Sequence, residues 1–351
     1  RVAWQLTDVQ RGDAAAIVPT ITVTGLTAPF GDVFVDASRL TTLEFRDILT
    51  LDRGRHAVRM GVEVRRITKD LAVGPAQAGS FAFNSIADFI ADRPFRQTLT
   101  VQPDTGAPTN VPRYFTQYET GAFVQDQWTV SNTLSVSLGL RHDYFGTVSE
   151  RDGRLSSVIL GQGATFEEQL RNAAIGRVDR LYTPQRLNVS PRVGLAWDQA
   201  GNGRASIRTG YSLAYQPHHG QSISGARALP PDAVQGVIQP ATGIGTRILY
   251  DIPVPANPEF GRGLNAQGGV QSRPGEPPIR TTGFVVNPTI KTQYTQSWFL
   301  NGQRRLGQHW RVELGYVGTR GVNLERIDDV NRFAGDLLDG REDRINPNFN
   351  V

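Results

Sequence analysis

Side chains that could do chemistry are few, and histidines are the first candidates. The chain has five histidines, and two of them, His218 and His219, are adjacent in a long irregular stretch. Neighbouring side chains point apart in an extended chain, so this pair could chelate a metal only within a turn. We therefore interpret the pair as part of a solvated loop and predict no metal site there.

Acidic pairs and catalytic motifs give no stronger signal. Residues 328–329 and 342–343 are acidic, but neither pair lies among the spaced oxygen ligands and central glycine that a calcium loop needs. The Gly-Asn-Gly segment at 201–203 is typical of a hairpin turn, because no helix follows it as in a phosphate-binding loop. No nucleophile elbow is present, and the lack of cysteine excludes disulfides and thiolate chemistry. We predict neither a cofactor nor an enzymatic activity.

A third set of candidates consists of charged residues that alternate with apolar ones. Arg59 and Glu63, for example, are interleaved with Val58, Met60 and Val62. Successive side chains of a strand point to opposite faces, so the charges would share one face. On this reasoning, the candidates for contact with a substrate are Arg59, Glu63, Arg141, Asp143, Arg192, Arg208, Arg311 and Glu313. We expect most of these charges to pair with neighbours across strands.

The elements that would position these residues recur along the chain. Four stretches begin with a polar turn and continue as an alternating strand that contains a glycine: residues 54–61, 132–139, 203–210 and 307–315. The pattern predicts hairpins at residues 41–51 with 55–65, 116–130 with a strand from 134, 187–198 with 204–215, and 293–306 with 309–318. A further strand is predicted at 18–25. Such repetition indicates a large antiparallel sheet.

Strand and connection lengths favour a transmembrane barrel. Each predicted strand has about 9 to 14 alternating residues; a tilted spanning strand needs about 9 to 11, and soluble strands have about 5 or 6. One end of each hairpin has a short turn, whereas the other end leads into long Gly- and Pro-rich stretches at 70–113, 146–186 and 216–292. Short periplasmic turns and long external loops alternate in this way in outer-membrane barrels.

The heights of aromatic residues along the strands indicate the same fold. Tryptophans lie beside the short turns and tyrosines towards the long loops, as expected for rings at the two levels of lipid headgroups. The membrane-interface candidates are Trp128, Tyr144, Trp197, Tyr215, Tyr294 and Trp310. These rings could instead form the core of a soluble β protein, but three tryptophans at one height on one face favour contact with outer-membrane lipid.

Some residues fit the alternation poorly. Asp47, Asp126 and Arg304 fall on faces that are otherwise apolar. The last two are near short turns, where a charge can reach the membrane surface at little cost. Asp47 would require a β-bulge that switches the two faces. On the polar face, three glycines are expected where strands coil or where something packs closely inside the barrel: Gly61, Gly139 and Gly210.

Composition narrows the class of protein further. The 351 residues carry a net charge of +4, and the 37 basic residues include only two lysines. No basic stripe with interleaved aromatic residues is present, so nucleic-acid binding is not predicted. The chain has no apolar run of about 18 residues that would form a transmembrane helix, and its first residues do not resemble a signal peptide. It begins without methionine, which we interpret as an internal segment of a longer protein.

Several segments together resemble the Oar-like, TonB-dependent outer-membrane receptors. In order along the chain, the resemblance is carried by residues 79–84, 87–94, 118–128, 138–144, 190–198, 201–203, 294–298 and 315–321. These segments are spread over most of the chain. Single motifs are short, but their order is fairly specific to that family.

The resemblance implies an all-β, antiparallel barrel of about 22 strands, plugged by an N-terminal domain that follows an energy-coupling box. Residues 1–351 contain neither, nor a last strand ending in an aromatic residue, so we expect them to form a single partial barrel domain. The implied function is import of an extracellular substrate through external loops and lumen, powered by an inner-membrane complex. The alternatives are a passive porin-like or adhesin-like barrel and a secreted carbohydrate-active β protein.

Overall fold

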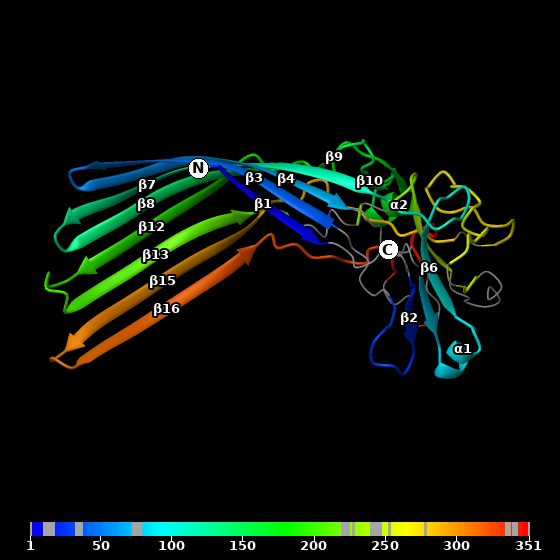
Figure 1. The fold of residues 1–351 in the computed structure, drawn as a ribbon. Helices are drawn as coiled ribbons and strands as arrows, with labels where there is room; N and C mark the ends of the chain where they lie inside the picture. The colour runs from blue at the N-terminus through cyan, green and yellow to red at the C-terminus, as the bar shows by residue number, and fades with distance from the viewer. Residues whose placement is uncertain are drawn as a thin grey trace.

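A computed structural model describes most of the chain. It covers residues 2–9, 18–31, 38–71, 79–218, 225–226, 229–238, 248–251, 254–276, 279–333, 338 and 343–349. Strands dominate these residues, and Figure 1 shows them as one long curved sheet with a compact assembly of shorter elements at one end. The two short helices of the described residues are not long and apolar enough to cross a membrane.

The large sheet places nine strands side by side in chain order (Figure 1). They are β1 (Val2–Val9), β3 (Ser38–Arg53), β4 (His56–Leu71), β7 (Arg113–Ser131), β8 (Leu134–Phe145), β12 (Asn188–Asp198), β13 (Ala205–Gln216), β15 (Gln293–Leu306) and β16 (Trp310–Val322). All neighbours are antiparallel, and the two-residue β9 (Ser149–Glu150) adds to β7. Within the described residues β1 and β16 are not joined, so the sheet is open, as expected for part of a barrel.

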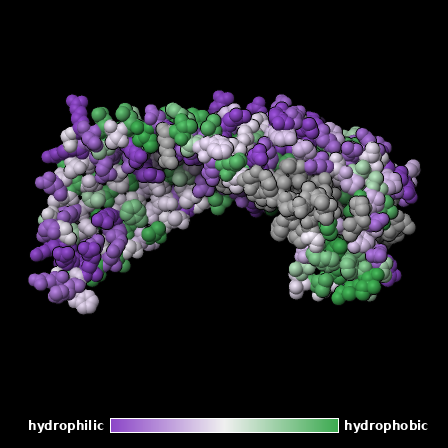
Figure 2. All heavy atoms as spheres, viewed as in Figure 1, coloured by the Kyte–Doolittle hydropathy of each residue, from purple (hydrophilic) through white to green (hydrophobic). Residues whose placement is uncertain are grey.

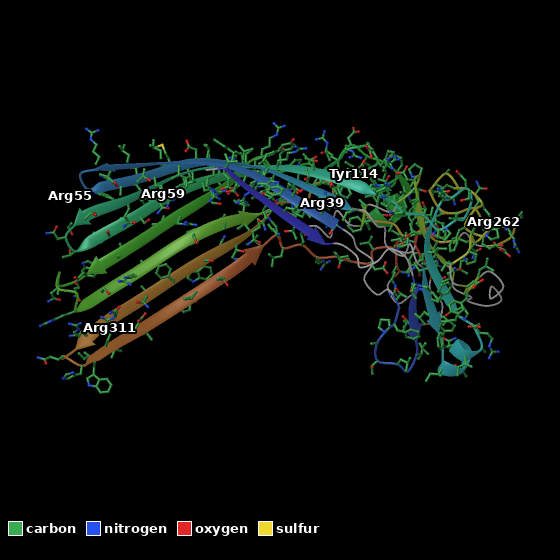
Figure 3. All side chains as sticks on the ribbon, viewed as in Figure 1. Arg39, Arg55, Arg59, Tyr114, Arg262 and Arg311 are labelled. Atoms are coloured by element: carbon green, nitrogen blue, oxygen red, sulfur yellow. The ribbon has the colours of Figure 1, made fainter. Side chains whose placement is uncertain are left out.

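Glycines form three of the four short turns. Gly54, Gly203 and Gly307 have φ of 61°, 69° and 65°. Side chains with a Cβ rarely adopt this left-handed backbone, whereas glycine adopts it without a steric cost. The predicted turns are confirmed, and Figure 3 shows Arg55 and Arg311 beside two of them at the same end of the sheet.

Register separates the sheet into two chemically different faces. The outer face carries apolar residues; Leu140, for example, lies between Val124 on β7 and Pro191 on β12. The lumen face carries Glu63, Asp143, Arg192 and the other residues of the same parity. Large apolar side chains of the outer face are exposed. A continuous apolar surface of this extent is unfavourable in water and is suited to lipid.

The sequence-based strand assignments are largely confirmed. The strand predicted at 293–306 has the same bounds as β15, and the predicted strands at 41–51 and 55–65 are extended in β3 and β4. The strand β1 was not predicted, because its partner β3 begins 29 residues later than Val9, too far for a local hairpin pattern. The predicted strand at 18–25 exists as β2 (Thr20–Val23), but it belongs to a different sheet.

The long connections are folded, which corrects the prediction that they are irregular. Strands β2, β5 (Ser80–Phe83), β6 (Arg96–Val101) and β14 (Val234–Ile238) form a four-stranded sheet in which β2 and β5 are parallel. A second small sheet pairs β10 (Ser156–Ile159) with β11 (Ala174–Arg177). The helices are α1 (Ile86–Ile90) and α2 (Phe166–Arg171). Such short strands depend on partners far away in sequence, so local patterns do not reveal them.

These shorter elements, β2, β5, β6, β10, β11, β14, α1 and α2 with their loops, have apolar cores of their own. We call them the external assembly, after the side of the membrane that the sequence predicts for them. Phe81, Phe83, Leu99, Val101 and Phe260 are fully buried among its strands and loops. Figure 2 shows that its tip, around α1 and β2, is strongly apolar on the visible face. The exposed apolar residues there include Leu26, Phe30, Ile86 and Ile90. The assembly is therefore a compact unit rather than a set of independent loops.

The two faces of β8 can be tested with one substitution on each. Leu140 lies on the outer face, four residues from both Tyr144 and Val136, the cross-strand neighbour of Trp128. We expect Leu140→Arg to destabilise the assembled barrel by about 2–4 kcal/mol, because it places a charge near the hydrocarbon centre. The measurement is the urea midpoint of the full-length protein refolded into lipid vesicles.

The matched control is Ser137→Arg, which places the same side chain on the lumen face of the same strand. We expect it to change the urea midpoint much less, because the lumen is wet. Equal losses for the two variants would contradict the assignment of the faces.

Candidate ligand-binding site

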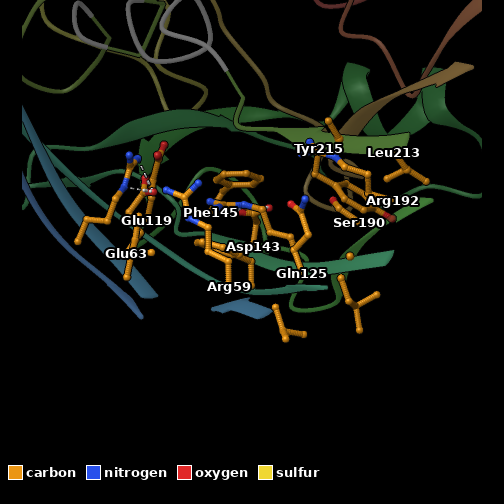
Figure 4. Close-up of a pocket in the computed structure, with 18 of the residues that line it drawn as sticks. Arg59, Glu63, Glu119, Gln125, Asp143, Phe145, Ser190, Arg192, Leu213 and Tyr215 are labelled. Atoms are coloured by element: carbon orange, nitrogen blue, oxygen red, sulfur yellow. Dashed lines mark hydrogen bonds and ion pairs between the residues drawn. The ribbon is translucent and has the colours of Figure 1, made fainter. Parts of the chain in front are cut away.

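The lumen face is hollowed where β3, β4, β7, β8, β12 and β13 lie side by side. The hollow, which we call the lumen pocket, has a volume of about 540 Å³. Figure 4 shows its charged lining with Gln125 between Arg59 and Arg192, and Phe145 beside them. A concave surface with convergent polar groups is the usual form of a ligand site.

An ion-pair network holds one side of the pocket. Glu63 accepts hydrogen bonds from Arg46 at 2.7 and 3.0 Å, and Arg65 approaches its other oxygen at 2.5 Å. Arg65 also donates to Glu44 at 2.9 Å and lies 3.7 Å from Glu119. Glu63 and Glu119 are each 7% exposed. Most of these contacts join directly opposed residues of β3, β4 and β7, so the predicted cross-strand pairing is confirmed for Glu63.

A second ion pair lies within one strand. Arg141 donates to the two oxygens of Asp143 at 2.8 and 3.0 Å, and both residues belong to the lumen face of β8. The pair lies over Gly121 on β7, where an added Cβ would be only 2.5 Å from an Arg141 nitrogen. Gly121 therefore makes room for this ion pair. Because Arg141 already holds the Asp143 carboxylate, that carboxylate is not free to attract another cation.

The sequence-predicted candidates divide into two groups. The pocket brings together Arg59, Glu63, Arg141, Asp143 and Arg192. The other three candidates face the same side but lie outside the pocket. Arg208 lies opposite Ala196 and Asn301, Arg311 is at the short-turn end of β16, and Glu313 accepts a hydrogen bond from Asn301 at 2.7 Å.

Sequence reasoning missed several residues that line the pocket. Glu119 and Gln125 have the same parity as the predicted lumen residues of β7, so alternation alone could have identified them. Phe123 and Phe145 also face the lumen, and their apolar character hid this placement. Ser190 has the parity of Arg192, so alternation also places it on the lumen face, but a serine in a strand does not by itself indicate a ligand site.

The aromatic candidates lie on the outer face at the predicted ends of the strands. Trp128, Trp197 and Trp310 are close to short turns, and Tyr144 lies opposite Thr120 towards the external assembly. Tyr215 and Tyr294 are direct cross-strand neighbours whose rings are 5.2 Å apart. Their geometry fits two aromatic belts, and their contact with lipid headgroups remains a prediction.

The two acids that fit the alternation poorly, Asp126 and Asp47, are accommodated differently. An Asp126 carboxylate oxygen lies 2.7 Å from His56 Nδ1, within hydrogen-bond distance. The His56 ring in turn stacks on the Trp128 ring, with 5.5 Å between their centroids. Asp47 lies on the outer face opposite Val62, and the register of β3 and β4 continues past it without a shift. The predicted bulge is therefore wrong, and Asp47 instead accepts a hydrogen bond from the Ile48 N–H at 3.0 Å.

Glycines of the lumen face allow aromatic rings to pack closely. A Cβ added to Gly61 would lie 2.7 Å from Phe123, and one added to Gly210 would lie 2.6 Å from Phe299. Both positions confirm the prediction of close packing inside the sheet. At Gly139 the nearest atom is 3.5 Å away, an ordinary contact, so this glycine opens the pocket floor instead.

The histidine pair is only partly described. His219 lies outside the described residues, whereas His218 is buried, contacts a Glu325 oxygen through Nδ1 and meets the edge of the Tyr182 ring at 5.0 Å. Burial, with a smaller effect of Glu325, raises the pKa of Tyr182 to about 12. Among the residues that the structure describes, no three His, Asp or Glu side chains are grouped to hold a metal.

The other acidic candidates are loop residues. Asp328 accepts from Arg326 at 2.7 Å, and Asp329 accepts from Arg344 at 3.3 Å. Glu342 lies outside the described residues, and Asp343 has no described role.

Fold and face chemistry define an antiparallel barrel domain of the bacterial outer membrane. Residues 5–351 match the family described as outer membrane beta-barrel domain, and the chain belongs to that family. A comparison with curated proteins found no match.

Solved structures show low similarity to this chain. The outer membrane transporter YddB from Escherichia coli is 14% identical with a TM-score of 0.40, over 86% of this chain and 29% of YddB. The alcaligin receptor FauA from Bordetella pertussis is 11% identical with a TM-score of 0.29, over 84% of this chain and 41% of FauA. This chain therefore spans less than half of either protein, and the assignment rests on the family match.

Close packing at Gly61 gives a prediction for stability. In Gly61→Ala the new Cβ would lie 2.7 Å from the Asp47 backbone oxygen as well as from Phe123. Backbone cannot move aside cheaply, so we expect a loss of about 1–3 kcal/mol in the free energy of unfolding. The measurement is urea unfolding of the full-length protein in detergent. Gly139→Ala is the control and should unfold like the wild type; equal losses would contradict the packing argument.

Proposed function

We propose that residues 1–351 are a partial barrel domain of a TonB-dependent outer-membrane receptor similar to the Oar-like proteins. The receptor binds an extracellular substrate with its external assembly and lumen and imports it. A plug domain of the same protein closes the barrel, and an inner-membrane complex supplies the energy. No reaction is catalysed.

The observation that carries the proposal is the lumen pocket beneath a folded external assembly. Its acids are held by arginines in a fixed arrangement, which suits recognition of a ligand more than unselective passage of water and ions. The external assembly buries its own apolar residues, so it can present a defined surface to a substrate. The order of receptor-like segments along the sequence supports the same reading.

The alternative is a passive porin-like or adhesin-like barrel. It has the same outer face and belts but needs neither a plug nor energy. The secreted carbohydrate-active protein is set aside, because the chain belongs to an outer-membrane family.

Energy dependence separates the proposal from the passive alternative. Cells that produce the full-length protein should deplete its substrate from a complex medium, as followed by mass spectrometry of the supernatant. We expect depletion to stop when the inner-membrane coupling complex is deleted or the proton gradient is dissipated. Depletion that continues without the gradient would identify a passive channel.

Topology gives a second test. We expect a peptide tag inserted beside Ala266, in the external assembly, to be labelled by antibody on intact cells. A tag between Ser131 and Asn132, at a short turn, should be labelled only after the outer membrane is opened. Labelling of the second tag alone on intact cells would reverse the proposed orientation.

A further inference from the structure

The lumen pocket carries positive charge that its own residues do not neutralise. Five arginines line it, Arg46, Arg59, Arg65, Arg141 and Arg192, against three acids, Glu63, Glu119 and Asp143. Each acid already lies beside a guanidinium group of Arg46, Arg65 or Arg141. Glu44, which does not line the pocket, also contacts Arg46 and Arg65, so the five arginines face four acids and one positive charge is in excess. Arg59 and Arg192 are the two pocket arginines that lie beside none of these acids.

Arg59 and Arg192 have no ion pair or hydrogen bond with any residue that the structure describes. They belong to one row across the sheet, in which Arg59 is opposite Gln125, Gln125 is opposite Gly139 and Gly139 is opposite Arg192. The two Cα atoms are thus three strand spacings apart, about 14 Å. Gln125 stands between the two arginines (Figure 4), and Gly139 adds no side chain beside Arg192.

A buried hydroxyl in the same pocket also lacks a partner. Ser190 is 6% exposed, and its Oγ forms no hydrogen bond. Ser190 is two residues before Arg192 on the lumen face of β12 and lines the pocket with it. Burying a hydroxyl without a hydrogen-bond partner is unfavourable, so Ser190 points to a ligand that accepts its hydrogen bond.

We propose that the lumen pocket binds a soluble anion that carries two or more carboxylate groups. Arg59 and Arg192 each hold one carboxylate through paired N–H donors, and Ser190 donates its hydroxyl to the carboxylate held by Arg192. Planar guanidinium groups match carboxylates in this way. The inference rests on the proposed function, in that it names the chemical class of the substrate.

The test is calorimetric titration of the full-length protein, purified in detergent, with citrate as the probe. We expect saturable binding that weakens with added salt. Arg59→Gln and Arg192→Gln should each weaken citrate binding at least tenfold, and Ser190→Ala severalfold. Inorganic phosphate, which is too small to reach both arginines, should bind at least tenfold more weakly than citrate.

Arg208→Gln is the matched control, because Arg208 faces the same lumen without a described partner but lies outside the pocket. It should bind citrate within twofold of the wild type. Absence of citrate binding to the wild type, or equal weakening by Arg192→Gln and Arg208→Gln, would overturn the inference. If no probe binds and Arg192→Gln lowers the unfolding temperature, an acidic side chain of the same protein occupies the pocket, and the inference is wrong.

A failure of the proposed import function can be distinguished from a failure of the pocket assignment. Citrate binding to purified protein requires no energy, so it can be intact while depletion of substrate by cells continues without a proton gradient. That combination would overturn active import and leave the pocket assignment standing.

Discussion

Cross-strand hydrogen bonding of the backbone is the constraint on which this structure depends. Hydrocarbon offers no partner for a free N–H or C=O, so a spanning strand must be paired on both sides. Within the described residues, every long strand from β3 to β15 has an antiparallel neighbour on each side, and only β1 and β16 have one. This ladder also fixes register, and register decides the face of every side chain, because a slip of one residue would exchange lipid-facing and lumen-facing groups.

Fixed faces allow charges to be kept in a membrane domain. Glu63 is almost fully buried, yet two arginines at defined positions on β3 and β4 hold it. On the outer face Asp126 is also paired: its partner is His56, near the short turns. Charge is therefore paired, or is near the membrane surface, or faces the wet lumen. Asp47 departs from this pattern: it stays on the outer face and bonds only its own backbone neighbour.

The external assembly is stabilised by different physics. It buries aromatic and aliphatic residues in small cores, as a soluble domain does, and its four-stranded sheet joins segments that are far apart in the sequence. Because those segments are the connections between barrel strands, folding them together ties the strand ends to one another. The small apolar cores and the hollow in the barrel wall thereby become parts of one structure.

Sequence by itself determined the barrel hairpins, the turns and the two faces. These features are local: alternation has a period of two, and Gly54 or Gly307 permits a backbone that other residues rarely adopt. Tertiary structure alone decided that β1 joins the sheet, that the long connections fold, and that Arg59 and Arg192 share one pocket with Ser190. The reason is that short strands and convergent side chains depend on partners brought together by register between distant segments, which no local pattern encodes.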